Sequence, residues 1–254
     1  MKIAYFDCFA GASGDMILGA LLDAGLALDR LRDALGRLQL EHHTLDVHPA
    51  VKQGLGGSQA LVLIDQDHHG EPNRGLHEIR TIIAASGLED IVKDRSLAIF
   101  QRLAQVEAAV HRVPLESVHF HEVGALDAIV DIVGAVAGLH LLEIQKVFCS
   151  PLHLGTGTVT SAHGTLPVPA PATLELVRGR PVYSSGVAGE LLTPTGAAIL
   201  TTLAEGFGPL PAMVPTAVGY GAGNAEREIP NLLRLVIGNA WSPRPGSTVF
   251  SEPS

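Results

Sequence analysis

The chain has 254 residues, 46% of them hydrophobic and 17% charged, with a formal net charge of -9 when histidine is neutral. This length and composition predict a packed globular protein and exclude a disordered chain. The acidic balance argues against a nucleic-acid surface, because neutralising phosphates requires clustered Lys and Arg. Only Cys8 and Cys149 occur, so no disulfide framework or CxxC zinc site is expected, and a reducing cytoplasm fits best.

The first part of the chain alternates strand-like and helix-like segments. Gly25 follows the first predicted helix as a C-terminal cap would. Apolar periodicity and turn residues predict strands at 2–6, 43–52, 59–64 and 147–149, and helices at 16–24, 28–38, 77–85, 89–111 and from about 124 to 143. The apolar helix carries Asp127, Asp131 and His140, so we expect a buried helix rather than a membrane span. No signal peptide is expected at the N-terminus.

After Ser150 proline and glycine become dense and the predicted elements become short. Helices are expected at 170–178 and 194–205, and strands at 213–220 and 231–237. Residues 240–254 form a Pro/Ser tail without periodicity, which predicts a disordered tail or linker. The predicted fold is therefore α/β: a mixed sheet with helices in residues 1–150, and a smaller Pro/Gly-rich α+β second half in residues 151–239.

The loop between the first strand and the first helix is a candidate ligand site. Gly11, Ser13 and Gly14 allow the backbone to approach a ligand closely, and the amides of the following helix favour an anion. Asp7 and Asp15 flank the loop and would repel a bare phosphate, so a metal-bridged phosphate or a metal alone suits it better. These two aspartates are the catalytic candidates. The alternative is a tight turn with Ser13 as helix N-cap.

The stretch from residue 119 to residue 131 carries the strongest chemical signal. Imidazoles and carboxylates are concentrated there, next to an apolar helix. Asp127 and Asp131 lie one helical turn apart, and a buried pair of ionised carboxylates is costly unless a cation meets them. His and carboxylate together suit a transition metal. The predicted ligands are His119, His121, Glu122, Asp127 and Asp131. The alternative is that Glu122 helps to cap the helix and the aspartates accept backbone hydrogen bonds.

Two further segments are candidates. His68, His69 and His77 form a looser group in and after a polar loop, where solvated histidines are an equally good interpretation of the metal-binding pattern. Thr193 is a predicted N-cap with Pro194 at the first helical position, so the amides near Thr195 and Gly196 would favour an anionic ligand.

Five collinear segments together resemble the LarC family of nickel insertion proteins. They are Phe6–Met16, His119–Asp131, His163–Thr173, Glu190–Ala198 and Gly219–Arg234, which span nearly the whole chain. The resemblance implies insertion of nickel into pyridinium-3,5-bisthiocarboxylic acid mononucleotide, driven by CTP hydrolysis, to make the nickel pincer cofactor of lactate racemase. It also implies that CTP with Mg or Mn is bound by a C-terminal domain or partner chain and not by this part.

Two departures from the family pattern matter. The chain stops at Ser254, about where the CTP-binding domain of family members would begin. The segment from Asp65 to His77 lacks the longer histidine run of many relatives, which puts nickel storage in doubt. The expected role is the N-terminal part of a nickel chelatase or cyclometallase, a lyase; the alternative is a non-catalytic nickel-binding module or metallochaperone. A homo-oligomer is an open possibility.

Overall fold

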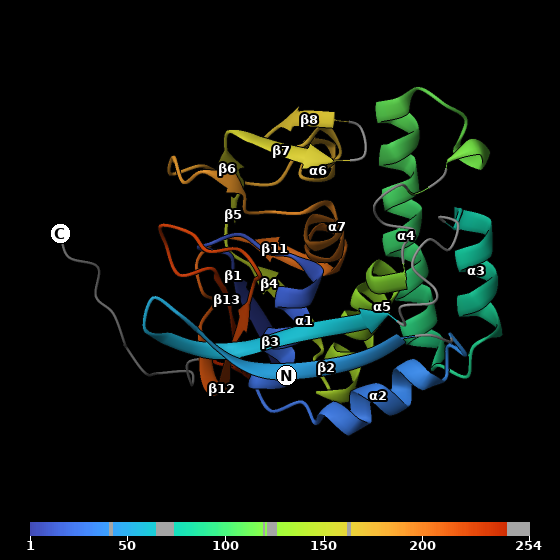
Figure 1. Ribbon diagram of the computed structural model, residues 1–254. Helices are drawn as coiled ribbons and strands as arrows, with labels where there is room; N and C mark the ends of the chain where they lie inside the picture. Colours follow the sequence, from blue (N-terminus) through green and yellow to red (C-terminus); the bar gives the residue numbers. More distant parts are fainter. Residues whose placement is uncertain (41–42, 65–73, 119, 121–125, 162–163, 243–254) are drawn as a thin grey trace.

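The computed structural model describes residues 1–40, 43–64, 74–118, 120, 126–161 and 164–242 (Figure 1). Its main feature is a seven-stranded mixed sheet with the strand order β11-β4-β1-β13-β12-β3-β2. The sheet strands are β1 (Lys2–Asp7), β2 (His43–Lys52), β3 (Leu55–Ile64), β4 (Lys146–Cys149), β11 (Ala204–Phe207), β12 (Met213–Ala222) and β13 (Leu232–Ala240). The predicted α/β class with a mixed sheet is confirmed.

The helices gather on one side of this sheet (Figure 1). They are α1 (Gly14–Asp23), α2 (Leu28–Gly36), α3 (Leu76–Ala85), α4 (Asp90–His111), α5 (Leu126–Leu141), α6 (Pro171–Leu176) and α7 (Pro194–Leu203), with a 3-10 turn at Leu115–Ser117. Helix α1 packs on β12 and β3, α5 packs on α1, and α4 contacts both α5 and α7. Helix α5 is buried almost throughout, as expected. No helix among the described residues has the length and apolarity that crossing a membrane requires.

Close packing of α1 on the sheet depends on glycine. A β-carbon at Gly221 of β12 would overlap the carbonyl oxygen of Met16, and one at Gly19 of α1 would overlap the carbonyl oxygen of Ser58 in β3. Helix and sheet backbones therefore touch without intervening side chains. Since α1 begins at the first Gly-rich loop, this contact also fixes the position of that loop over the sheet.

The two cysteines lie at the ends of β1 and β4. Cys8 and Cys149 are both buried free thiols whose Sγ atoms are 3.5 Å apart.

Between residues 152 and 190 the described chain forms three two-stranded sheets, separate from the main sheet. The parallel pair is β5 (Leu152–His153) with β9 (Val182–Tyr183); the antiparallel pairs are β6 (Gly155–Thr156) with β10 (Gly189–Glu190), and β7 (Thr158–Ser161) with β8 (Gly164–Pro167). His153 of β5 connects this region to the first Gly-rich loop. Its Nδ1 lies 2.7 Å from the carbonyl oxygen of Phe9, and its Nε2 accepts a hydrogen bond from the Ser185 backbone N–H at 3.1 Å.

One predicted helix extends too far. The helix expected at 194–205 ends at Leu203, and the chain continues directly into β11, which pairs with β4 in the main sheet. Ala204 and Glu205 continue the helical pattern in sequence, but Ala204 pairs with Val147 of β4, and Glu205 lies at an irregularity in the same strand pair. Tertiary context overrides local propensity here.

We expect Gly221→Ala to destabilise the protein by about 2 kcal/mol, because the added methyl overlaps the α1 backbone and forces the helix away from the sheet. Gly36→Ala is the matched control. A β-carbon at Gly36, on the exposed face of α2, meets nothing within 4 Å, so this change should leave stability the same or raise it by about 0.5 kcal/mol. Chemical denaturation measures both, and equal stability of the two variants would contradict this packing.

Candidate functional site

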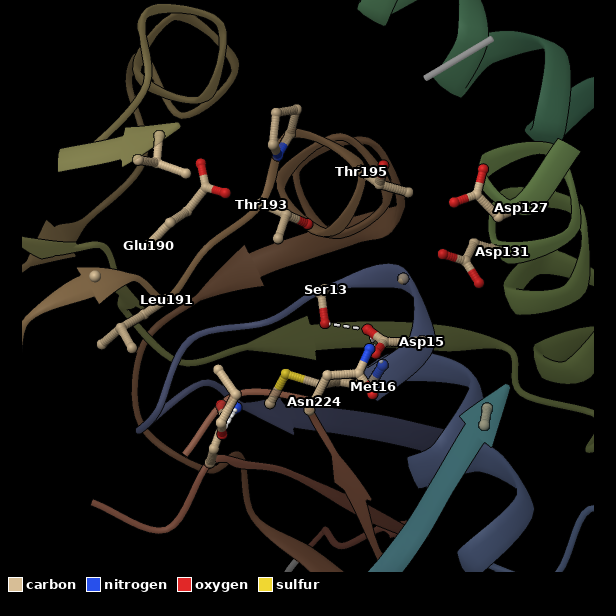
Figure 2. A pocket seen from close by; sticks show the side chains of 18 of the residues that line it. Ser13, Asp15, Met16, Asp127, Asp131, Glu190, Leu191, Thr193, Thr195 and Asn224 are labelled. Carbon is tan, nitrogen blue, oxygen red and sulfur yellow. Dashed lines mark hydrogen bonds between the residues drawn. The ribbon is translucent and has the colours of Figure 1, made fainter. Parts of the chain in front are cut away.

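A cavity of about 640 Å³ opens where the first turns of α1, α5 and α7 come together (Figure 2). The wall includes Ser13, Gly14 and Asp15 from α1, Asp127 and Asp131 from α5, Thr193 and Thr195 from the start of α7, and Asn224, Arg227 and Asn231 from the loop between β12 and β13. The cavity therefore brings together residues of three segments predicted from the sequence: the first Gly-rich loop, the start of α5 and the α7 entrance.

Backbone contacts hold the α1 and α7 entrances together. The Ala12 N–H donates to the carbonyl oxygen of Leu191 at 3.0 Å, and the Thr193 N–H donates to that of Ala12 at 3.1 Å. Gly11 has a φ of 85° and faces the Leu191 carbonyl, while Gly196 faces the carbonyl of Ala12; a β-carbon at either glycine would overlap that oxygen. The predicted glycines are thus needed for loop-to-loop contact, and their role toward a ligand stays a prediction.

The entrance of α7 has the predicted cap. Thr193 adopts extended backbone geometry, and its Oγ accepts a hydrogen bond from the Gly196 N–H at 3.2 Å, with Pro194 at the first helical position. The α1 entrance differs. Ser13 is its N-cap residue by backbone geometry, but its hydroxyl donates to the carboxylate of Asp15 instead of capping the helix. The Met16 N–H also donates to that carboxylate, at 2.9 Å.

Three carboxylates face one part of the cavity: Asp15 from α1, and Asp127 and Asp131 from α5 (Figure 2). Burial, and then the charges of Asp15 and Asp127, raise the pKa of Asp131 well above its usual range. Burial also raises the pKa of Asp15, against the opposing effect of its hydrogen bonds from Ser13 and Met16. The Oδ1 atom of Asp131 is buried and has no hydrogen-bond partner among the described residues. Such a group is costly unless a cation or a proton meets it.

Gly14 makes room for this cluster. A β-carbon at Gly14 would overlap the Oδ2 atom of Asp131. The Asp131 side chain therefore lies directly on the first turn of α1, although the two residues are far apart in sequence. The positive end of a helix dipole next to a carboxylate is a favourable arrangement that offsets part of the repulsion within the cluster.

The other predicted metal ligands are not brought into this site by the described structure. His119, His121, Glu122, His68 and His69 lie outside the described residues, and His77 is exposed on the first turn of α3. No group of three or more His, Cys, Asp or Glu side chains within the described part of the chain is arranged to hold a metal ion. The complete ligand set stays a prediction; Asp127 and Asp131 are its two members that line the cavity.

Asp7 and Asp15 were expected to act together, and the structure separates them. Side chains alternate along β1, so Asp7 lies on the opposite face of the sheet from the core residue Phe6. Its carboxylate accepts hydrogen bonds from Arg234, with the Nε bond at 3.1 Å, and it lines a different hollow of about 350 Å³ with Tyr5 and Tyr220. Of these two aspartates, Asp15 lines the main cavity and Asp7 does not. Asp7 still follows the alternation of β1, whereas Asp15 lies on the first turn of α1.

The sequence did not predict the part of the cavity wall that comes from the loop between β12 and β13. Asn224, Arg227 and Asn231 line the cavity from the β12–β13 loop. They belong to a segment that resembles the family, but no local motif distinguishes them, since their position depends on how a loop folds over the end of the sheet.

Comparisons with known proteins agree on one family. The sequence model of the family described as "Nickel insertion protein" matches residues 4–252. A "Pyridinium-3,5-bisthiocarboxylic acid mononucleotide nickel insertion protein" of Desulfitobacterium hafniense is 53% identical over 238 residues, which is 94% of this chain and 58% of the relative. "Putative nickel insertion protein" sequences of Dictyoglomus thermophilum and Syntrophobacter fumaroxidans are 44% and 50% identical, each over 94% of this chain and 61% of the relative. No solved structure gives a significant match.

We expect Asp131→Asn to stabilise the metal-free protein at pH 7. The pKa of Asp131 is raised in the folded state, so its stabilising effect is complete only below the unfolded value of about 3.9 and declines as the pH rises toward the folded value. Asparagine has no such proton to lose, and its amide can donate to the neighbouring carboxylates.

Thermal melts in a chelator should therefore show a small difference between variant and wild type near pH 4 that widens toward pH 7. Asp33→Asn, on the exposed face of α2, is the control and should show little effect. A loss of stability in Asp131→Asn at pH 7 would mean that this carboxylate is a satisfied structural acceptor.

Proposed function

This chain belongs to the nickel insertion protein family, and from that premise we propose that its cavity binds nickel and a pyridinium-3,5-bisthiocarboxylic acid mononucleotide for nickel insertion. The observation that carries the proposal is the unpartnered, buried Oδ1 of Asp131 within a cluster of three carboxylates on a cavity wall. Nickel is the cargo of this reaction. The chain spans about 60% of the length of the curated relatives it matches, so the activity of the whole protein is part of the proposal.

The chemistry of the cluster supports nickel as the cation. Carboxylates alone would suit a hard cation such as magnesium, whereas imidazole nitrogen favours nickel and its neighbours. His119, His121 and Glu122 precede α5 directly in the chain. We propose that they complete the ligand set with Asp127 and Asp131, with Asp15 supplying further negative charge. His68, His69 and His77 remain candidates for a second, looser nickel site.

The size of the cavity and its helix entrances support a mononucleotide as the second ligand. A volume of about 640 Å³ lies within the usual range for small-molecule sites. The first turns of α1 and α7 contribute backbone amides and the Ser13, Thr193 and Thr195 hydroxyls, which suit the thiocarboxylate groups of such a ligand.

We further propose that complete cofactor synthesis needs the part of the relatives' length that has no counterpart in these 254 residues. CTP, with Mg or Mn, would bind to that part, and the joint product would be a nickel chelatase of the lyase class acting in the cytoplasm. The carboxylate cluster by itself also supports a second candidate function, a nickel-binding module that delivers the metal to a partner without catalysis of its own.

Nickel binding is the first test. Calorimetry should show a nickel site that weakens about tenfold or more in the His119→Ala/His121→Ala double variant and in Asp131→Asn. The site should also weaken as the pH falls, because imidazole ligands must lose their protons. His140→Ala changes an exposed histidine at the far end of α5 and is the matched control. Unchanged affinity in both ligand variants would remove the cluster from the nickel site.

Product formation separates the enzyme from the binding module. We expect the chain alone to give no CTP-dependent metallation of the dithiocarboxylate mononucleotide, and mass spectrometry should detect the nickel product once the remaining part of a relative is added. Nickel transfer to that part without product would favour the binding module. Product formation by the chain alone, at full rate, would contradict the proposed division of labour.

A further inference from the structure

The two sides of the cavity differ in charge. Three carboxylates, Asp15, Asp127 and Asp131, lie on one side, and a single carboxylate, Glu190, lies on the other (Figure 2). The guanidinium of Arg227 lies at this second side, where its Nη2 donates to the Glu190 carbonyl oxygen at 2.8 Å. Arg227 is the sole basic side chain in the cavity wall as far as the described residues go. An anionic group in the cavity therefore meets three carboxylates on one side, and one carboxylate with a fixed positive charge on the other.

The orientation of Arg227 is set by two backbone carbonyls. In addition to the bond to Glu190, its Nη1 donates to the Ala188 carbonyl oxygen at 2.9 Å. Gly189 lies directly against the guanidinium, and a β-carbon at this position would overlap it. These bonds use two of the five N–H donors of the side chain, and Nε is buried without an acceptor among the described residues. The guanidinium is thus held in place, and the donors left for a ligand are the remaining N–H groups of Nη1 and Nη2.

A second donor comes from the same loop as this arginine. Asn224 also lines the cavity, and its Oδ1 accepts a hydrogen bond from the Gln59 side chain, which leaves its amide nitrogen as a donor. Asn231 fixes the loop by donating from Nδ2 to the Ala225 carbonyl oxygen at 2.8 Å and by accepting at its own carbonyl from the Gly223 N–H at 3.0 Å. The loop between β12 and β13 consequently offers the cavity a cation and an amide donor.

We propose that Arg227, with support from Asn224 of the same loop, forms the subsite for the phosphate monoester of the ligand. The assignment rests on the proposed function and gives the ligand a direction: phosphate toward Arg227, metal-binding groups past the α7 entrance toward the three carboxylates. It differs from the sequence expectation, which gave the phosphate to the α1 entrance. That entrance carries Asp15 and touches Asp131, and their charges repel a dianion over a few ångströms.

The test uses two pyridinium probes, nicotinic acid mononucleotide and nicotinic acid riboside, which differ only in the phosphate. Calorimetry on wild type should give a preference of about tenfold or more for the mononucleotide, the size expected for charged hydrogen bonds. Arg227→Gln should abolish this preference while leaving affinity for the riboside and for nickel unchanged. Arg227→Lys should retain part of the preference, since lysine keeps the positive charge but lacks the planar guanidinium and its several N–H donors. Arg178→Gln, a surface arginine paired with Glu175, is the control and should match wild type.

Several results would overturn the assignment. Arg227→Gln with an intact preference for the mononucleotide, or wild type with equal affinity for both probes, would place the phosphate elsewhere. Loss of nickel, riboside and mononucleotide binding together, in both Arg227 variants and with a lowered melting temperature, would show that the arginine only holds the 188–190 segment. Wild type that binds nickel but neither probe would overturn the subsite together with the proposed substrate, and wild type that binds none of the three would overturn the proposed function itself.

Discussion

Contact between two backbone segments, 8–13 and 191–196, is the constraint on which the site depends. The segments exchange hydrogen bonds through Ala12, Leu191 and Thr193, and no side chain fits between them at Gly11 or Gly196. Because each segment leads directly into a helix, their contact sets the first turns of α1 and α7 side by side. The glycine contact of α1 with β12 then fixes these two helix starts over the sheet. The first turns of α5 complete the cavity wall.

This arrangement gathers the carboxylates of Asp15, Asp127 and Asp131 at one part of the cavity wall, which costs folding stability. Asp131 lies on the first turn of α1, yet its Oδ1 is left without a partner among the described residues. Hydrogen bonds from Ser13 and Met16 offset only part of this cost: burial raises the pKa of Asp15, and burial followed by the neighbouring carboxylates raises the pKa of Asp131. Strain of this kind is expected at binding sites, where a ligand supplies the missing interaction. A cation is the ligand that relieves all three carboxylates at once.

The sequence predicted what local patterns determine. Apolar periodicity located the main helices, alternation located the β2–β3 pair, and the Thr193–Pro194 signature gave a correct cap. Pairing partners distant in sequence were harder: β11 was taken for the end of a helix, and the short strands between residues 152 and 190 were not predicted. In the site, Asp15 and Asp131 were assigned to separate ligands although they face each other, and Asp7 was grouped with Asp15 although the strand alternation turns it to the other side of the sheet. Arg227 carried no signal, because only the folded loop brings it to the cavity wall.

The unequal charge at the two ends of the cavity has a consequence for how its proposed ligands bind. Without a metal, the three carboxylates repel an anionic ligand at one end, and Arg227 attracts it at the other. A divalent cation at the carboxylates removes the repulsion, so each ligand strengthens the binding of the other, and by thermodynamic linkage it does so by the same factor. A pyridinium ligand that carries metal-binding sulfur at one end and phosphate at the other would make use of both ends. Under the proposed function, the carboxylate cluster would then be the feature that couples nickel to its acceptor.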